Sequence, residues 1–202
     1  MKWFAFTAAL LFSASVISNS LTSPAQQTIT HLPEFTHSGA ESWINSPPLK
    51  KQDLTGKVVL IDVWTFDCWN CYRSFPWLNE LEKKYQNNGF QIIGIHTPEF
   101  KHEKLRSNIE HKAREFKLHH PIMIDNDFSY WRALNNHYWP TYYLVNQQGE
   151  IVYSHIGETH SGDQKARVLE QKIQELLAIP TGYNETSEKV SQIKYPLNTY
   201  RL

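Results

Sequence analysis

The chain has 202 residues, of which 41% are hydrophobic and 20% are charged, and its 20 lysines and arginines are balanced by 20 acidic residues. A chain without a basic field is not expected to bind nucleic acid. The sequence contains only two cysteines, so the fold is not a disulfide-built scaffold, and its length suffices to bury a core without such cross-links.

Residues 1–25 have the pattern of a secretory signal peptide. Lys2 supplies a positive charge, residues 3–12 form an apolar stretch, and small residues around Ala25 suit cleavage. Cleavage after Ser20 fits equally well, and an N-terminal membrane anchor is the alternative, because the apolar stretch is nearly long enough for one. We expect an exported protein. An oxidising compartment and a single close cysteine pair together favour a bacterial periplasmic redox protein.

The remaining chain divides into three segments. Residues 26–54 are polar and contain Pro33, Pro47 and Pro48, so we expect an N-terminal extension with at most short edge strands. Residues 55–179 form the predicted domain. Residues 180–202 form a C-terminal tail without a clear hydrophobic period.

Strands and helices alternate through the first half of the domain. Residues 58–64 form an almost continuous apolar run, typical of a strand covered on both faces, and the residues that follow Cys71 have helical spacing. Residues 90–95 form a second apolar strand after a turn at Gly89. Four apolar residues then recur at helical spacing: Leu105, Ile109, Ala113 and Phe116.

The second half continues this alternation. Residues 121–124 are a candidate strand and residues 128–135 a candidate short helix. Residues 142–145 and 151–154 are two strands joined by a short polar turn, which predicts a hairpin. An amphipathic helix that ends before Pro180 closes the domain. The expected fold class is therefore α/β, with a central β-sheet flanked by helices.

The two cysteines, Cys68 and Cys71, lie where the first strand gives way to the first helix. A thiol at a helix N-terminus faces unsatisfied backbone N–H groups and the positive end of the helix dipole, and both favour the thiolate form. Cys68 is therefore predicted to be the nucleophile that attacks disulfides. Cys71 lies on the same side one helical turn later and is predicted to resolve the mixed disulfide. The pattern indicates thiol–disulfide exchange.

Two other interpretations of the cysteine pair are weaker. A structural disulfide that closes a ring of four residues stabilises a chain by only roughly 2 kcal/mol. A structural zinc site needs about four ligands, and the sequence has no second cysteine pair to complete one. We therefore expect no metal, and no cofactor apart from a redox-active disulfide between Cys68 and Cys71.

The order of these elements resembles the thioredoxin fold. Asp62 stands six residues before Cys68, in an Asp-Val-Trp segment that is similar to the Asp-Phe-Trp of thioredoxins. Pro76 stands five residues after Cys71, at the position of that family's helix kink. Pro140 opens the hairpin where the family carries a cis-proline. The strand and helix between residues 116 and 136 resemble the insertion of the TlpA and ResA branch of periplasmic reductases.

Five short segments are similar to the soluble C-terminal domain of DipZ-type proteins. They are residues 46–49, 56–60, 96–100, 125–127 and 138–140. DipZ-type proteins join this domain to a membrane electron-transfer module, whereas this sequence shows no row of transmembrane segments. The resemblance therefore implies disulfide-containing protein substrates and a separate membrane thiol–disulfide donor that regenerates the dithiol.

The resemblance also implies a role for Asp62. A carboxylate inside an apolar strand should have a raised pKa, which would suit it to pass protons to and from the resolving thiol. A solvated strand end is the alternative. Glu99, after the second strand, is another acid that the resemblance places near the dithiol, but a surface carboxylate is the simpler interpretation.

Three further residues are expected to contact the substrate. The resemblance implies that Pro140 is cis and leaves the backbone of Trp139 free to pair with an extended substrate segment. An ordinary proline at the start of a strand is the alternative. Trp69 and Trp139 are expected to form an apolar docking surface at the rim of the site, whereas Trp64 is expected in the core.

The charges around the nucleophile favour a reductant. Asp67 directly precedes Cys68, and no lysine or histidine lies between the cysteines. Local charges therefore do not add to the helix in stabilising the thiolate. Since strong oxidants depend on a stabilised reduced form, we expect a potential nearer that of thioredoxin than that of DsbA.

Two other functions fit parts of the sequence. Thr65 and Cys68 reproduce the T-x-x-C portion of the peroxiredoxin motif, although Ile61 stands where the proline of that motif should be. A thiol peroxidase is therefore one alternative. The thiolates of Cys68 and Cys71 also suit Cu(I), with His137 as a further ligand, so a copper carrier is the other. The favoured interpretation is a periplasmic thiol–disulfide oxidoreductase.

Overall fold

The computed structural model describes residues 30–178, and the predicted signal segment and C-terminal tail lie outside this range. Six strands form one sheet in the order β1-β4-β3-β2-β5-β6. The strands are β1 (Trp43–Ile44), β2 (Val58–Trp64), β3 (Phe90–His96), β4 (Ile122–Ile124), β5 (Thr141–Val145) and β6 (Ile151–Ile156). The α-helices are α1 (Trp69–Tyr85), α2 (Arg106–Glu115), α3 (Ser129–Ala133) and α4 (Gln164–Leu177). Short 3₁₀ helices are η1 (Ala40–Ser42), η2 (Lys51–Leu54) and η3 (Lys101–Lys104).

The sheet is mixed. Strands β2, β3 and β4 run parallel, as crossover connections through helices require. Strand β5 runs antiparallel to β2, and β6 pairs with β5 as the predicted hairpin. The short strand β1 pairs antiparallel with β4 at the sheet edge, which agrees with the expectation of at most short edge strands in this part of the chain. The predicted α/β class with a central mixed sheet is confirmed.

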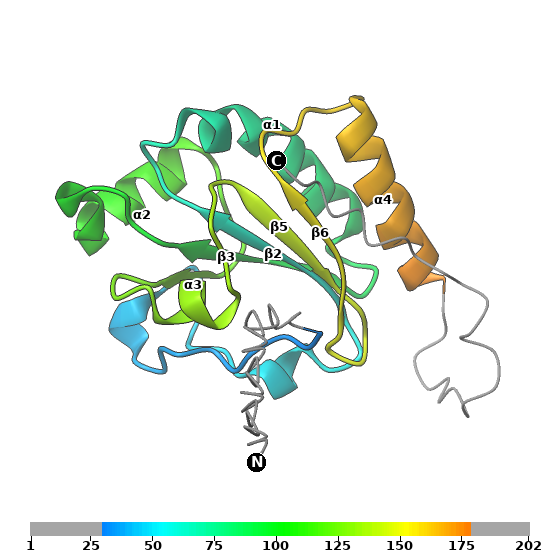
Figure 1. Ribbon diagram of the computed structural model, residues 1–202, viewed down its shortest axis with the longest axis horizontal. Helices are drawn as coiled ribbons and strands as arrows, with labels where there is room; N and C mark the ends of the chain where they lie inside the picture. Colours follow the sequence, from blue (N-terminus) through cyan, green and yellow to red (C-terminus); the bar gives the residue numbers. More distant parts are fainter. Residues whose placement is uncertain (1–29, 179–202) are drawn as a thin grey trace, which may run out of the picture.

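Helices cover both faces of the sheet (Figure 1). Residues of α1, α2 and α4 pack on one face in a cluster that includes Leu60, Trp64 and Cys71. Residues of α3 and of the N-terminal segment pack on the other face with Ile61 and Val63. All seven residues of β2 are buried, because this strand lies between two strands and between two layers. No helix within residues 30–178 has the length and apolar character needed to span a membrane.

The prediction that Leu105 belongs to the apolar face of the second helix is wrong. Ile109 and Ala113 are buried as expected, but Leu105 is 56% exposed. Residues Lys101–Lys104 form η3, and Leu105 follows it with an extended backbone that precedes α2. The helix therefore begins one residue later, and the Leu105 side chain does not lie on its buried face.

Gly94 lies at a crowded position in the middle of the sheet. It pairs with Asp62 on β2 and with Ile122 on β4. A β-carbon at this position would lie 3.0 Å from Trp64 Nε1, 3.1 Å from Ile122 Cγ1 and 3.3 Å from His120 Nε2. All three neighbours are themselves buried, so none of them can move away easily.

We therefore expect Gly94→Ala to lower the free energy of unfolding by about 1–3 kcal/mol through overpacking. Urea denaturation measures this change. Gly39→Ala is the matched control, because Gly39 has an extended backbone and the three atoms nearest to its added β-carbon all belong to the exposed, movable carboxylate of Glu41. Equal effects of the two substitutions would contradict this view of the core.

Candidate active site

The two cysteines lie at the carboxyl end of β2, where the chain turns into α1. Cys68 is the N-cap residue of α1, and its Sγ accepts a hydrogen bond from the backbone N–H of Cys71 at 3.3 Å. The first helical hydrogen bond runs from the Tyr72 N–H to the Cys68 carbonyl at 3.0 Å. The sulfur of Cys68 therefore occupies the position where a helix leaves backbone donors without partners.

The two thiols are free and have opposite surroundings. Cys68 is partly exposed, whereas Cys71 is fully buried. A hydrogen bond from the Cys71 thiol and further bonds from the Cys71 and Asn70 amides lower the pKa of Cys68, although partial burial and the charge of Glu99 oppose this change. Burial and the hydrogen bond to Cys68 raise the pKa of Cys71 well above its usual value. Cys68 is thus the more acidic and more accessible thiol.

Asp62 lies on β2 beneath the dithiol and is almost completely buried. Neither of its carboxylate oxygens has a hydrogen-bond partner among the described residues. Burial, and next the charge of Cys68, raise its pKa well above the usual range. Its charge in turn contributes to the raised pKa of Cys71. Asp62 is therefore close enough to both sulfurs for their protonation states to be coupled.

Trp139 and Pro140 lie at the same end of the sheet as the dithiol. Thr141 at the start of β5 pairs with Val63 near the end of β2, so the two preceding residues lie beside the turn that carries Cys68. The Trp139–Pro140 peptide bond is cis, in agreement with the prediction. The Trp139 indole is partly buried because it packs on Trp131 and donates a hydrogen bond to the Thr97 carbonyl at 3.1 Å.

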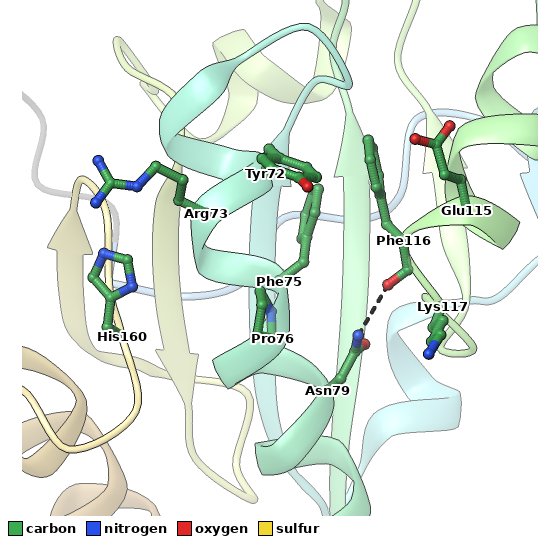
Figure 2. A pocket seen from close by; sticks show the side chains of 9 residues that line it. All are labelled: Tyr72, Arg73, Phe75, Pro76, Asn79, Glu115, Phe116, Lys117 and His160. Carbon is green, nitrogen blue, oxygen red and sulfur yellow. Dashed lines mark hydrogen bonds between the residues drawn. The ribbon is translucent and has the colours of Figure 1, made fainter.

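An aromatic strip runs from the dithiol along α1. Trp69, which follows Cys68, is 67% exposed and packs on Tyr72 with ring centroids 5.5 Å apart. Tyr72 contacts Phe116 at 5.4 Å, and Phe116 stacks on Phe75 at 4.9 Å. These last three side chains line a groove of about 520 Å³ between α1 and the end of α2, shown in Figure 2. Trp64, in contrast, is fully buried in the core, as expected.

Glu103 is a residue near the site that the sequence did not single out. It is fully buried, and its Oε1 accepts hydrogen bonds from the Thr65 hydroxyl and from the Asp67 N–H at 3.1 Å. Its Oε2 accepts from the N–H groups of Glu99 and Phe100, both at 2.6 Å. In the sequence, Glu103 lies in the charged run 101–104, which has the character of a solvated segment. No local pattern distinguishes it there.

Other titratable residues surround this end of the sheet. His96 is fully buried between the rings of Trp64 and Phe66, and burial lowers its pKa to about 3. Its Nε2 lies 3.4 Å from the Thr65 hydroxyl. Glu99 is exposed, yet it is close enough to oppose ionisation of Cys68.

Within residues 30–178, one group of three side chains has the spacing of a metal site, and it consists of His37, Asp125 and Asp127. It includes neither cysteine and does not include His137. The two oxygens of Asp125 already accept backbone N–H bonds from Tyr130 and Trp131, both at 2.9 Å. This carboxylate therefore has its hydrogen bonds satisfied by the start of α3.

A mixed sheet with a C-x-x-C pair at the start of its first long helix, a buried aspartate beneath the pair and a cis-proline beside it defines a thioredoxin-like domain. A family model described as Redoxin matches residues 30–173. The chain belongs to the Redoxin family. This assignment agrees with the resemblance found in the sequence.

Individual relatives and structures support the same assignment. The chain is 36% identical over 142 residues to Protein DipZ of Mycobacterium tuberculosis (strain CDC 1551 / Oshkosh), a match that covers 69% of this chain and 20% of that protein. It is 27% identical over 147 residues to Thiol-disulfide oxidoreductase YkuV of Bacillus subtilis (strain 168), which covers 73% of this chain and 94% of that protein. A thioredoxin-like protein solved in the oxidized form is 26% identical, with a TM-score of 0.63 over 74% of this chain and 96% of that chain. The match thus spans about one fifth of the length of DipZ.

Replacement of Asp62 with Asn should stabilise the fold at neutral pH. Because the folded-state pKa is raised above the ordinary value of 3.8, the stability linked to the protonated carboxyl is present below pH 3.8 and is lost as the pH rises through the folded-state pKa. Asn does not titrate, so we expect Asp62→Asn to be more stable than wild type by about 1–3 kcal/mol at neutral pH.

Urea denaturation at several pH values measures this difference, which should narrow below about pH 4. Asp53→Asn is a suitable control because Asp53 is exposed. A destabilised Asp62→Asn protein at neutral pH would contradict the conclusion that the buried carboxyl is poorly accommodated.

Proposed function

We propose that this protein is a thiol–disulfide oxidoreductase that reduces disulfide bonds in other proteins. Cys68 is the nucleophile, Cys71 is the resolving thiol and Asp62 accepts a proton from Cys71. The observation that carries this proposal is the difference between the two thiols. Cys68 is accessible and has a lowered pKa, whereas Cys71 is buried and has a raised pKa. The similarity to YkuV, which is named a thiol-disulfide oxidoreductase, supports the same reaction class.

The first step is attack by the Cys68 thiolate on one sulfur of the substrate disulfide. A bond forms between Cys68 and that sulfur, the substrate S–S bond breaks, and the other substrate sulfur leaves as a thiolate. Cys68 can take this role because it is partly exposed and because the helix N-terminus provides amide donors for its anion. The product of this step is a mixed disulfide.

The second step is attack by Cys71 on the Cys68 sulfur of the mixed disulfide. The Cys71 thiol passes its proton to the Asp62 carboxylate, and the resulting thiolate forms the Cys68–Cys71 bond and displaces the second substrate thiolate. Two electrons have then moved from the dithiol to the substrate. The raised pKa of Asp62 makes its carboxylate a better proton acceptor for a thiol whose own pKa is high.

Substrate contacts are assigned to residues around Cys68. Trp69 presents a large exposed ring directly beside the nucleophile, and an aromatic side chain of this kind can bind apolar substrate groups at low entropic cost. Trp139 and Pro140 lie on the neighbouring strand connection at the same end of the sheet. We assign these three residues to binding of an extended substrate segment next to its disulfide.

The direction of transfer is assigned as reduction of the substrate. Hydrogen bonds from Cys71 and Asn70 stabilise the thiolate of Cys68, and the acidic side chain of Glu99 opposes that stabilisation. Since further stabilisation of the thiolate would make the pair more oxidising, the opposing charge of Glu99 favours a reducing pair. We further propose that the protein acts after export to the periplasm, that a membrane thiol–disulfide donor regenerates it, and that the Cys68–Cys71 disulfide is its only redox group, with no obligate metal.

Cys71→Ser should accumulate mixed disulfides with substrate proteins. Without the resolving thiol, the second step cannot occur, so the adduct on Cys68 persists. The measurement is non-reducing electrophoresis and mass spectrometry after reaction with a disulfide-containing protein such as insulin. Cys68→Ser is the matched control and should form no adduct.

Insulin reduction by wild type should exceed that of either variant by at least about a hundredfold. Absence of adducts with Cys71→Ser would contradict the proposal. Peroxide turnover faster than disulfide reduction would favour a peroxidase instead.

A further inference from the structure

We propose that Glu103 is a positioning residue for the nucleophile: its buried carboxylate fixes the loop that leads from β2 into α1 against the loop that follows β3. This inference rests on the proposed function, because it concerns how Cys68 is held ready for attack. Glu103 contacts neither cysteine in the hydrogen bonds described above. It acts through the loop residues that precede Cys68.

The carboxylate of Glu103 joins two loops at the site end of adjacent parallel strands. Strands β2 and β3 end side by side, with Trp64 paired to His96. Oε1 binds the first loop through Thr65 and Asp67, and Oε2 binds the second loop through Glu99 and Phe100. One side chain therefore holds both loops at a fixed separation.

A carboxylate removed from solvent is very unfavourable unless its oxygens are fully hydrogen-bonded. Glu103 meets this requirement with four donors, one hydroxyl and three backbone N–H groups, all of them uncharged. Charge-assisted bonds of this kind are stronger than those between neutral groups. The network is therefore rigid, and its loss would free two loops at once.

The first loop determines where Cys68 lies. The Cys68 N–H donates to the Thr65 carbonyl at 3.4 Å, and the Asp67 N–H, one residue before Cys68, donates to Glu103. The sulfur of Cys68 receives its helix-terminus bond only while it stays at the N-cap position. A displaced loop would move the sulfur away from the Cys71 amide, and the thiol pKa would rise toward its ordinary value.

The second loop carries one acid near the dithiol and one exposed aromatic side chain. Glu99 is close enough to oppose the Cys68 thiolate, and Phe100 is 50% exposed. Six titratable groups surround Cys68 and Glu103. They are Cys71, Asp62, Glu99, Asp67, His102 and His96.

Glu103→Gln separates a positioning role from a purely electrostatic one. The amide has the same shape, but its NH₂ group would face backbone N–H donors, so at least one donor would lose its acceptor. If Glu103 positions Cys68, the thiol pKa should rise by about one unit, and the thiolate fraction at pH 7 should fall accordingly, by at most about tenfold. If only its negative charge mattered, removal of that charge would lower the pKa.

The measurement is the ultraviolet absorbance of the thiolate as a function of pH in the reduced full chain. Glu110→Gln is the matched control, because Glu110 is a partly exposed glutamate on α2 that pairs with Arg106. In this variant the Cys68 thiol should titrate as in wild type. An unchanged or lowered Cys68 pKa in Glu103→Gln would overturn the inference. If Cys71→Ser still traps mixed disulfides in that case, the proposed function stands.

Thr65→Val provides a second test that preserves the buried carboxylate. This substitution removes one of the four donors and keeps the shape of the side chain. We expect a smaller rise of the Cys68 pKa in the same direction. A thiol that titrates as in wild type would contradict the proposal, whether or not Glu103→Gln folds.

Discussion

A helix that begins directly at the end of a buried strand gives two cysteines three residues apart very different surroundings. The first, Cys68, lies at the N-cap, where backbone donors are available and solvent has access. The second, Cys71, lies one turn inside the helix and faces the core formed by the sheet and α1. The chemistry proposed here follows from this difference in environment. The rest of the fold keeps β2 buried and the start of α1 fixed.

Two buried carboxylates near the dithiol differ in how their oxygens are hydrogen-bonded. Glu103 accepts four hydrogen bonds, which stabilise its carboxylate and hold it in a fixed position. Asp62 has no hydrogen-bond partner among the described residues, and its pKa is raised by burial. A satisfied carboxylate suits a rigid positioning role, whereas an unsatisfied one exchanges a proton readily. The contrast fits the two different roles proposed for these acids.

Much of this arrangement could be predicted from the sequence, because β2 and β3 are continuous apolar runs and the C-x-x-C pair lies between a strand and a helix. The position of Leu105 could not, since residues 101–104 form a separate 3₁₀ helix whose Glu103 is buried against Thr65 and Asp67. Glu103 itself lies in the charged run 101–104, and such a run predicts exposed side chains. Its partners at residues 65–67 are distant in the sequence and become neighbours only when parallel β2 and β3 align.

The most direct test of the account is the alkylation rate of each cysteine in the reduced full chain across a range of pH, with mass spectrometry assigning the modified residue. The account predicts that Cys68 reacts first, with a midpoint below that of an ordinary thiol, while Cys71 stays unmodified in the folded protein. Equal rates at the two cysteines, or faster modification of Cys71, would contradict it.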